Sequence, residues 1–79
     1  MEKNLPEYYC ALVKKNLRRL KDEKGWTTLD MSRVTGVSEG YLNSLLSLKV
    51  SKVPTIYMLG VICENAEIPI EYFFEEKDK

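Results

Sequence analysis

The sequence predicts an all-α protein, folded as a compact bundle of five short helices. Apolar residues recur at intervals of three and four along most of the chain, which is the period of an amphipathic helix. Helix-capping residues precede these segments, and glycines follow the first two. No segment alternates as a strand does. With 79 residues, 44% of them hydrophobic, the chain fits a single domain over residues 1–79, with a core from about 5 to 74 and a frayed tail at 75–79.

The first helix is predicted to run from about Pro6 to Lys24. Asn4 suits the N-cap, Pro6 the first turn, and Glu7 can close a capping box. Gly25 supplies a left-handed residue to end the helix. The residues expected on its buried face are Leu5, Tyr9, Leu12, Val13, Leu17 and Leu20. Those expected on its basic, opposite face are Lys14, Lys15, Arg18 and Lys21.

Two short helices joined by a tight turn come next. Thr27 is the predicted N-cap of the second helix, Asp30 completes a capping box, and Gly36 ends the helix after about eight residues. Ser38 caps the third helix. Met31 and Val34 of the second helix are expected to point inward. The third helix carries Tyr41, Leu42, Leu45, Leu46 and, if it runs so far, Leu48, and its end from Leu45 to Leu48 is expected to turn to the core. A turn containing glycine between two short helices is the helix-turn-helix arrangement.

A loop and two further helices complete the chain. The loop covers residues 49–54, because β-branched residues before Pro54 favour extended backbone. Thr55 caps the fourth helix, "NAEIP" interrupts it, and Pro69 opens a short last helix. The inward-facing residues of the fourth helix are expected to be Ile56, Leu59, Ile62 and Cys63, and the last short helix carries Ile70, Phe73 and Phe74.

The composition argues against several classes of function. The chain has no histidine, and Cys10 and Cys63 form no metal-binding motif, so we expect two buried, reduced thiols, no metal and no cofactor. Without histidine the common general-base arrangements are missing, so we do not expect an enzyme. No apolar run approaches the roughly 20 residues of a membrane span. The N-terminus, "MEKNLPEYYC", lacks the apolar stretch of a signal peptide, so we expect a cytoplasmic protein without membrane contact.

Charge is unevenly distributed along the chain although the net charge is zero. Residues 14–52 carry nine basic and four acidic side chains, whereas residues 53–79 carry six acidic and two basic ones. A molecule polarised in this way can present a basic face to nucleic-acid phosphates.

Three segments together resemble the lambda-repressor-like, Cro-type helix-turn-helix family, also called the xenobiotic-response-element family, of bacterial and phage regulators. They are "NLRRLKDEKGWT", "DMSRVTGVSEGYL" and "VPTIYMLGVICENAEIPIEYFF", and the resemblance covers Val13 to Phe74. The chain departs from the family at Thr28, where members carry Gln, and at Leu48, where members carry Gly. It also departs at Leu46 and Lys21, where many members pair a Glu with a base.

The resemblance assigns expected roles to residues of the second and third helices. The base-facing residues would be Ser38, Glu39, Gly40, Asn43 and Ser44. The phosphate contacts would be Thr28, Arg33, Tyr41, Lys49 and Lys52. Three residues keep a structural alternative: Tyr41 as half-buried packing, Glu39 as a favourable charge at a helix start, and Trp26 as a lid on the core rather than a surface anchor.

The last segment is expected to hold a homodimer together. Its apolar residues exceed what a short terminal helix buries within one small monomer, and they are Ile68, Ile70, Tyr72, Phe73 and Phe74. The expected function is then sequence-specific binding of double-stranded DNA by a small dimeric transcription regulator, repressor-like, at an inverted-repeat operator. The alternative is a protein-binding module on the same fold, an antirepressor or an accessory factor of a mobile element. It is favoured by the zero net charge, the acidic and uncharged reading positions, and the Leu-rich end of the third helix.

Overall fold

The computed structural model describes residues 5–50 and 52–76, and these residues form four α-helices and one 3-10 helix without any strand. The α-helices are α1 (Leu5–Lys24), α2 (Thr28–Thr35), α3 (Glu39–Leu46) and α4 (Ile56–Ala66), and the 3-10 helix is η1 (Ile70–Phe74). The chain is therefore all-α, as predicted. Its expected fifth helix is only a 3-10 turn of five residues.

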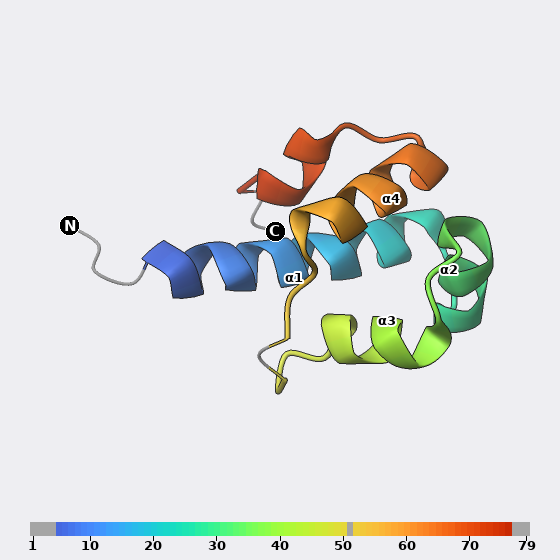
Figure 1. Cartoon of the computed structure of the whole chain (residues 1–79), viewed down its shortest axis with the longest axis horizontal. Coiled ribbons are helices and arrows are strands. Elements are labelled where there is room, and N and C mark those ends of the chain that lie inside the picture. The colour runs from blue at the N-terminus through green and yellow to red at the C-terminus, as the bar shows by residue number, and fades with distance from the viewer. Residues whose placement is uncertain (1–4, 51, 77–79) are drawn as a thin grey trace.

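The long helix α1 packs against two of the other elements. It contacts η1 on one side and α3 on the other, while α2 packs against both α3 and α4. In Figure 1, α4 and η1 lie above α1, α3 lies below it, and α2 closes one end. The first turns of α1 project beyond the bundle at the opposite end.

The helices α2, α3 and α4 begin after the N-cap residues that the sequence predicts. The Thr27 hydroxyl accepts from the Asp30 N–H and the Asp30 carboxylate accepts from the Thr27 N–H, both at 3.0 Å, so the capping box is complete. The Ser38 hydroxyl accepts from the Tyr41 N–H at 3.3 Å, and the Thr55 hydroxyl accepts from the Met58 N–H at 3.1 Å. The predicted cap of α1, Asn4, lies outside the described residues.

Two helix ends carry the predicted glycines, and α4 ends at Ala66, within the segment "NAEIP" that is predicted to interrupt it. Gly25 and Gly36 adopt positive φ angles of 70° and 80°, as expected of left-handed terminal residues. By contrast, the residue that follows α4 is Glu67 at a φ of 61°, which is uncommon for a residue with a side chain. Helix α3 ends at Leu46 with extended backbone at Ser47, so Leu48 lies beyond the helix and is 63% exposed.

The core lies where the four α-helices and η1 meet. It consists of Val13, Leu17, Leu20, Met31, Val37, Leu42, Leu45, Leu46, Leu59, Ile62, Cys63, Ala66 and Phe73. Trp26 packs against it, half-buried. The predictions for Val34 and Ile56 are wrong, because both side chains are exposed. The predictions for Leu5 and Tyr9 are also wrong, because both residues are exposed. The buried residues of α1 begin at Leu12.

Polar contacts attach the last segment to α1. The Asn16 side-chain amide donates to the carbonyls of Phe73 and Glu75 at 2.8 and 2.9 Å. The Arg19 guanidinium lies 4.0 Å from the centroid of the Tyr72 ring and donates to the Glu75 carboxylate at 2.7 Å. Glu75 is therefore bound to α1 rather than frayed, and residues 77–79 of the predicted tail lie outside the described residues.

The two cysteines form no disulfide bond. Cys63 is buried as expected, whereas Cys10 is only half-buried. Within 5–50 and 52–76, no helix has the length and apolar character needed to cross a membrane.

Candidate nucleic-acid interface

The predicted reading residues lie on one side of α3. Leu42, Leu45 and Leu46 are buried against the core, and this fixes which side of the helix faces outward. Glu39, Gly40 and Asn43 are exposed on the outer side, Ser38 is exposed at the N-cap, and Ser44 is half-buried at the edge. The outward surface of α3 is thus polar and short-armed, with a single acidic side chain.

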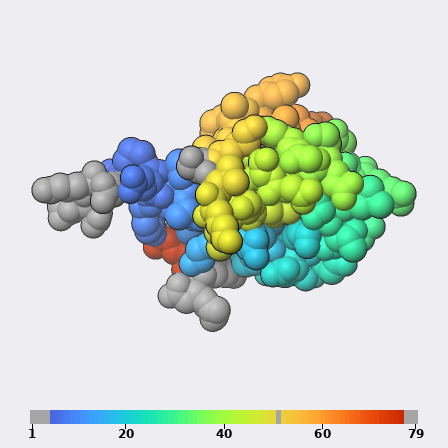
Figure 2. All heavy atoms as spheres, turned by 90° about the horizontal axis from the view of Figure 1, so that it is seen from below, coloured from blue at the N-terminus to red at the C-terminus, as the bar shows by residue number. Residues whose placement is uncertain are grey.

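An aromatic and a basic residue form one flank of this surface. The Lys52 ammonium lies 4.8 Å from the centroid of the Tyr41 ring, close enough for a cation–π interaction. Tyr41 is half-buried and packs against the core, so the packing role expected as its alternative is also present. The loop that carries Lys49 and Lys52 shares a face of the molecule with α3, as Figure 2 shows in yellow and yellow-green.

A buried lysine holds this loop against α3. Lys14 was expected on the basic, solvent-facing side of the first helix, and that prediction is wrong because only 5% of the residue is exposed. Its ammonium donates to the carbonyls of Ser44, Leu45 and Lys52 at 3.2, 2.8 and 2.5 Å. The first two are orphan carbonyls at the end of α3, which no local residue caps. Burial lowers the pKa of Lys14.

Sequence reasoning missed Lys14 because its partners lie about 30 residues away. One local signal for the burial of Lys14 is that it directly follows Val13 on a helix whose apolar face is wide. A second indirect signal is the absence of a glycine or a basic residue in the last turn of α3, which leaves its carbonyls in need of a donor.

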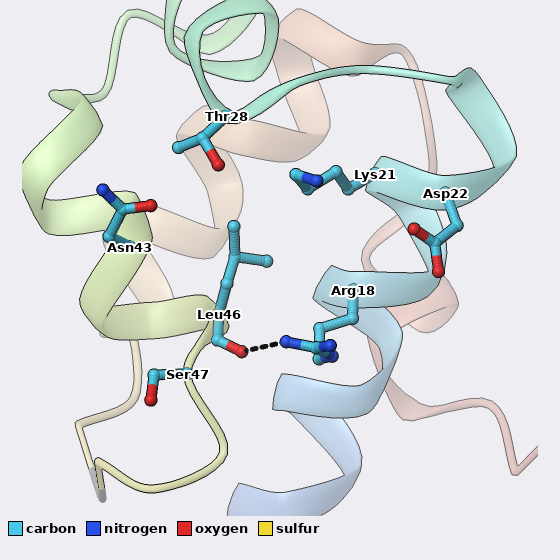
Figure 3. A pocket seen from close by; sticks show the side chains of 7 residues that line it. All are labelled: Arg18, Lys21, Asp22, Thr28, Asn43, Leu46 and Ser47. Atoms are coloured by element: carbon cyan, nitrogen blue, oxygen red, sulfur yellow. Dashed lines mark hydrogen bonds between the residues drawn. The ribbon is translucent and has the colours of Figure 1, made fainter.

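A surface pocket forms the other flank of α3. Its volume is about 240 Å³, and three helices contribute to its wall (Figure 3). The lining residues are Arg18, Lys21, Asp22, Thr28, Asn43, Leu46 and Ser47. Two predicted contact residues, Thr28 and Asn43, therefore meet here. Arg18 is exposed, as expected, and its guanidinium also donates to the Leu46 carbonyl at 2.8 Å.

The remaining predicted phosphate contacts are more dispersed. Lys49 is exposed just beyond α3, and its N–H donates to the Ser47 hydroxyl at 3.2 Å. Arg33 is exposed in the last turn of α2 and does not line the pocket beside α3. The structure thus gathers Thr28, Tyr41 and Lys52 around the α3 surface more closely than it does Arg33.

The predicted dimer surface needs one correction. Phe73 is completely buried in the core of the monomer, so it cannot supply a dimer contact. Ile68 and Tyr72 are half-buried against the same core, whereas Ile70 and Phe74 are exposed. The Phe74 ring lies in edge contact with Tyr9, with 6.4 Å between the ring centroids, and so joins η1 to the projecting start of α1.

Across 5–50 and 52–76, no group of three or more Cys, Asp or Glu side chains is placed to hold a metal ion. Hydroxyls, an amide and ammonium groups are the donors beside α3, and such groups serve for contacts to phosphates and base edges. Comparisons of the chain with protein-family models, with curated proteins and with solved structures found no significant match.

Proposed function

We propose that the protein is a sequence-specific DNA-binding transcription regulator in which α2 and α3 act as a helix-turn-helix. The proposal rests on the outward surface of α3, which is polar and mostly exposed. On one side it is bordered by Tyr41 and by Lys52, whose ammonium lies over the Tyr41 ring. On the other side it is bordered by Thr28, Lys21 and Arg18. A helix that enters the major groove lies between two phosphate backbones and needs donors on both flanks.

Base reading would come from three side chains of α3. Asn43 can bind the N6 and N7 edge of adenine, Glu39 can accept from the N4 amine of cytosine, and Ser44 can serve as donor or acceptor. Gly40 lets the backbone approach the groove closely. None of these groups is a long, positively charged side chain such as Arg or Lys. Affinity would therefore rest on phosphate contacts from Thr28, Tyr41, Lys49 and Lys52 and on the shape of the DNA.

A dimer would double this small surface. Two copies would place their α3 helices in successive major grooves about 34 Å apart, on an inverted-repeat operator, and repress transcription by occupying it. With Phe73 assigned to the core, the dimer contact would use Ile70 and Phe74 with the adjoining Tyr9 and the half-buried Ile68 and Tyr72.

The test is a salt titration of binding to duplex DNA, followed by fluorescence anisotropy, with two paired variants. For random duplexes the logarithm of affinity should fall linearly with the logarithm of salt, with a slope of about −0.9 for each phosphate neutralised. Exchanging Glu39 and Ser44 for Ala should change the preferred sequence, whereas exchanging Lys49 and Lys52 should weaken all sequences alike. Absence of binding at low salt would overturn the proposal.

A protein-binding module on the same fold is the second candidate. It is favoured by exposed apolar side chains close to α3 in the chain, which a DNA-binding surface does not need: Leu48, Ile56 and Tyr57 are 63%, 69% and 78% exposed. Such a module would bind as an antirepressor or accessory factor of a mobile element. It predicts that Leu48→Ser abolishes partner binding, while duplex DNA fails to bind at any salt concentration.

A further inference from the structure

The pocket beside α3 brings together donors that are far apart in the sequence. Arg18 and Lys21 reach from α1 toward a hollow that Thr28 and Asn43 border from α2 and α3 (Figure 3). Its volume of about 240 Å³ leaves room for one tetrahedral anion and some of its hydration.

The donors of this pocket have hydrogen-bonding capacity to spare. Arg18 uses one N–H on the Leu46 carbonyl at 2.8 Å, and a guanidinium has five N–H groups. Lys21 is half-buried, and both ion pairs found among the described residues belong to Arg19. Leu46 fills the α3 side of the pocket wall with an apolar group, so α3 offers Lys21 no carboxylate there.

We propose that this pocket binds one phosphate group, held by Lys21 and Arg18 as cations and by the Thr28 hydroxyl as a neutral donor, while Asn43 borders the pocket and keeps its amide for base reading. The assignment of that phosphate to a DNA backbone rests on the proposed function. The pocket itself would recognise the negatively charged oxygens of a tetrahedral phosphate group. Inorganic phosphate and a DNA phosphodiester share these oxygens.

One lining residue opposes the anion and makes the proposal testable in both directions. Asp22 is exposed at the pocket wall, and its carboxylate repels a phosphate. Removal of this charge should therefore strengthen binding, while removal of the Lys21 charge should weaken it. Lys24, exposed in the last turn of α1 and outside the pocket, provides the control for a simple loss of one positive charge.

The first arm of the experiment uses random duplex DNA and the variants Lys21→Gln, Asp22→Asn and Lys24→Gln. Lys21→Gln should lower affinity roughly five- to tenfold for every sequence and reduce the salt slope by about one. Asp22→Asn should raise affinity roughly two- to fivefold, and Lys24→Gln should stay within about twofold of wild type. Circular dichroism melts confirm that each variant is folded.

The second arm titrates ¹⁵N-labelled protein with inorganic phosphate at constant ionic strength. Saturable shifts of the Thr28, Asn43 and Ser47 amide signals are expected in the wild type and should disappear in Lys21→Gln. If DNA binds but Lys21→Gln behaves as Lys24→Gln does, the pocket assignment is overturned and the proposed function stands. If DNA fails to bind while phosphate saturates these signals, the pocket stands as a site for a small phosphorylated ligand and the proposed function falls. If neither binds, both fall.

Discussion

Replacement of Lys14 by Met should destabilise the protein by about 2–4 kcal/mol. Met keeps the length of the side chain but removes the donor that the carbonyls of Ser44, Leu45 and Lys52 share. The Leu45 carbonyl is bound in the buried interior, and leaving it without a donor costs about 1–3 kcal/mol. The other two bonds are only partly buried, so water can replace the lysine there at a cost of about 0.5–1 kcal/mol each.

One opposing term limits this loss. Burial of the Lys14 ammonium costs desolvation free energy, and the same desolvation lowers the pKa of Lys14. Lys14→Met removes this cost, so the total loss of stability is smaller than the sum of three charged hydrogen bonds. The remaining loss is still large, since a chain of 79 residues has a free energy of unfolding of about 4–12 kcal/mol.

Urea unfolding measures the effect, followed by far-ultraviolet circular dichroism and by the fluorescence of Trp26. Lys15→Met is the matched control, because Lys15 is the exposed neighbour on the same helix and should change stability by no more than about 0.5 kcal/mol. If Lys14→Met is as stable as Lys15→Met, or more stable than wild type, the bonds of Lys14 contribute no net stability and the reasoning is refuted.

Three further predictions concern the capping box and the two phenylalanines of η1. The Thr27 N–H bond to the carboxylate lowers the pKa of Asp30, so the stability from that charge is complete above the ordinary carboxyl pKa of about 3.9 and is lost as pH falls through the lowered value. The gap in urea midpoint between wild type and Asp30→Asn should therefore be widest at neutral pH and close in strong acid; a gap independent of pH would disprove this. Phe73→Ala should cost about 3–5 kcal/mol because the ring is fully buried. Phe74→Ala should leave the monomer folded but halve the mass seen by light scattering, and an unchanged mass would place the dimer contact elsewhere or rule it out.

Local sequence determined where the helices begin. Thr27, Ser38 and Thr55 each accept a bond from an N–H three residues later, so the signal and its effect lie within one turn. The same locality made Gly25 and Gly36 readable as helix ends, because a left-handed conformation suits glycine regardless of what surrounds it. The polar outward side of α3 follows from these caps and from the period of its leucines.

Tertiary structure decided which side chains are buried and which ones meet. Periodicity placed Lys14 outside and Leu5 and Tyr9 inside, yet α3 crosses α1 beside Lys14, and the bundle stops short of the first turns of α1. Phe73 became a core residue because Asn16 holds the backbone of η1 against α1. The meeting of Lys21 with Thr28 and Asn43 depends on how three helices pack, and no local pattern encodes it. Sequence alone thus determined the helices and the polar character of α3, whereas the packing of helices distant in the chain decided which donors surround it.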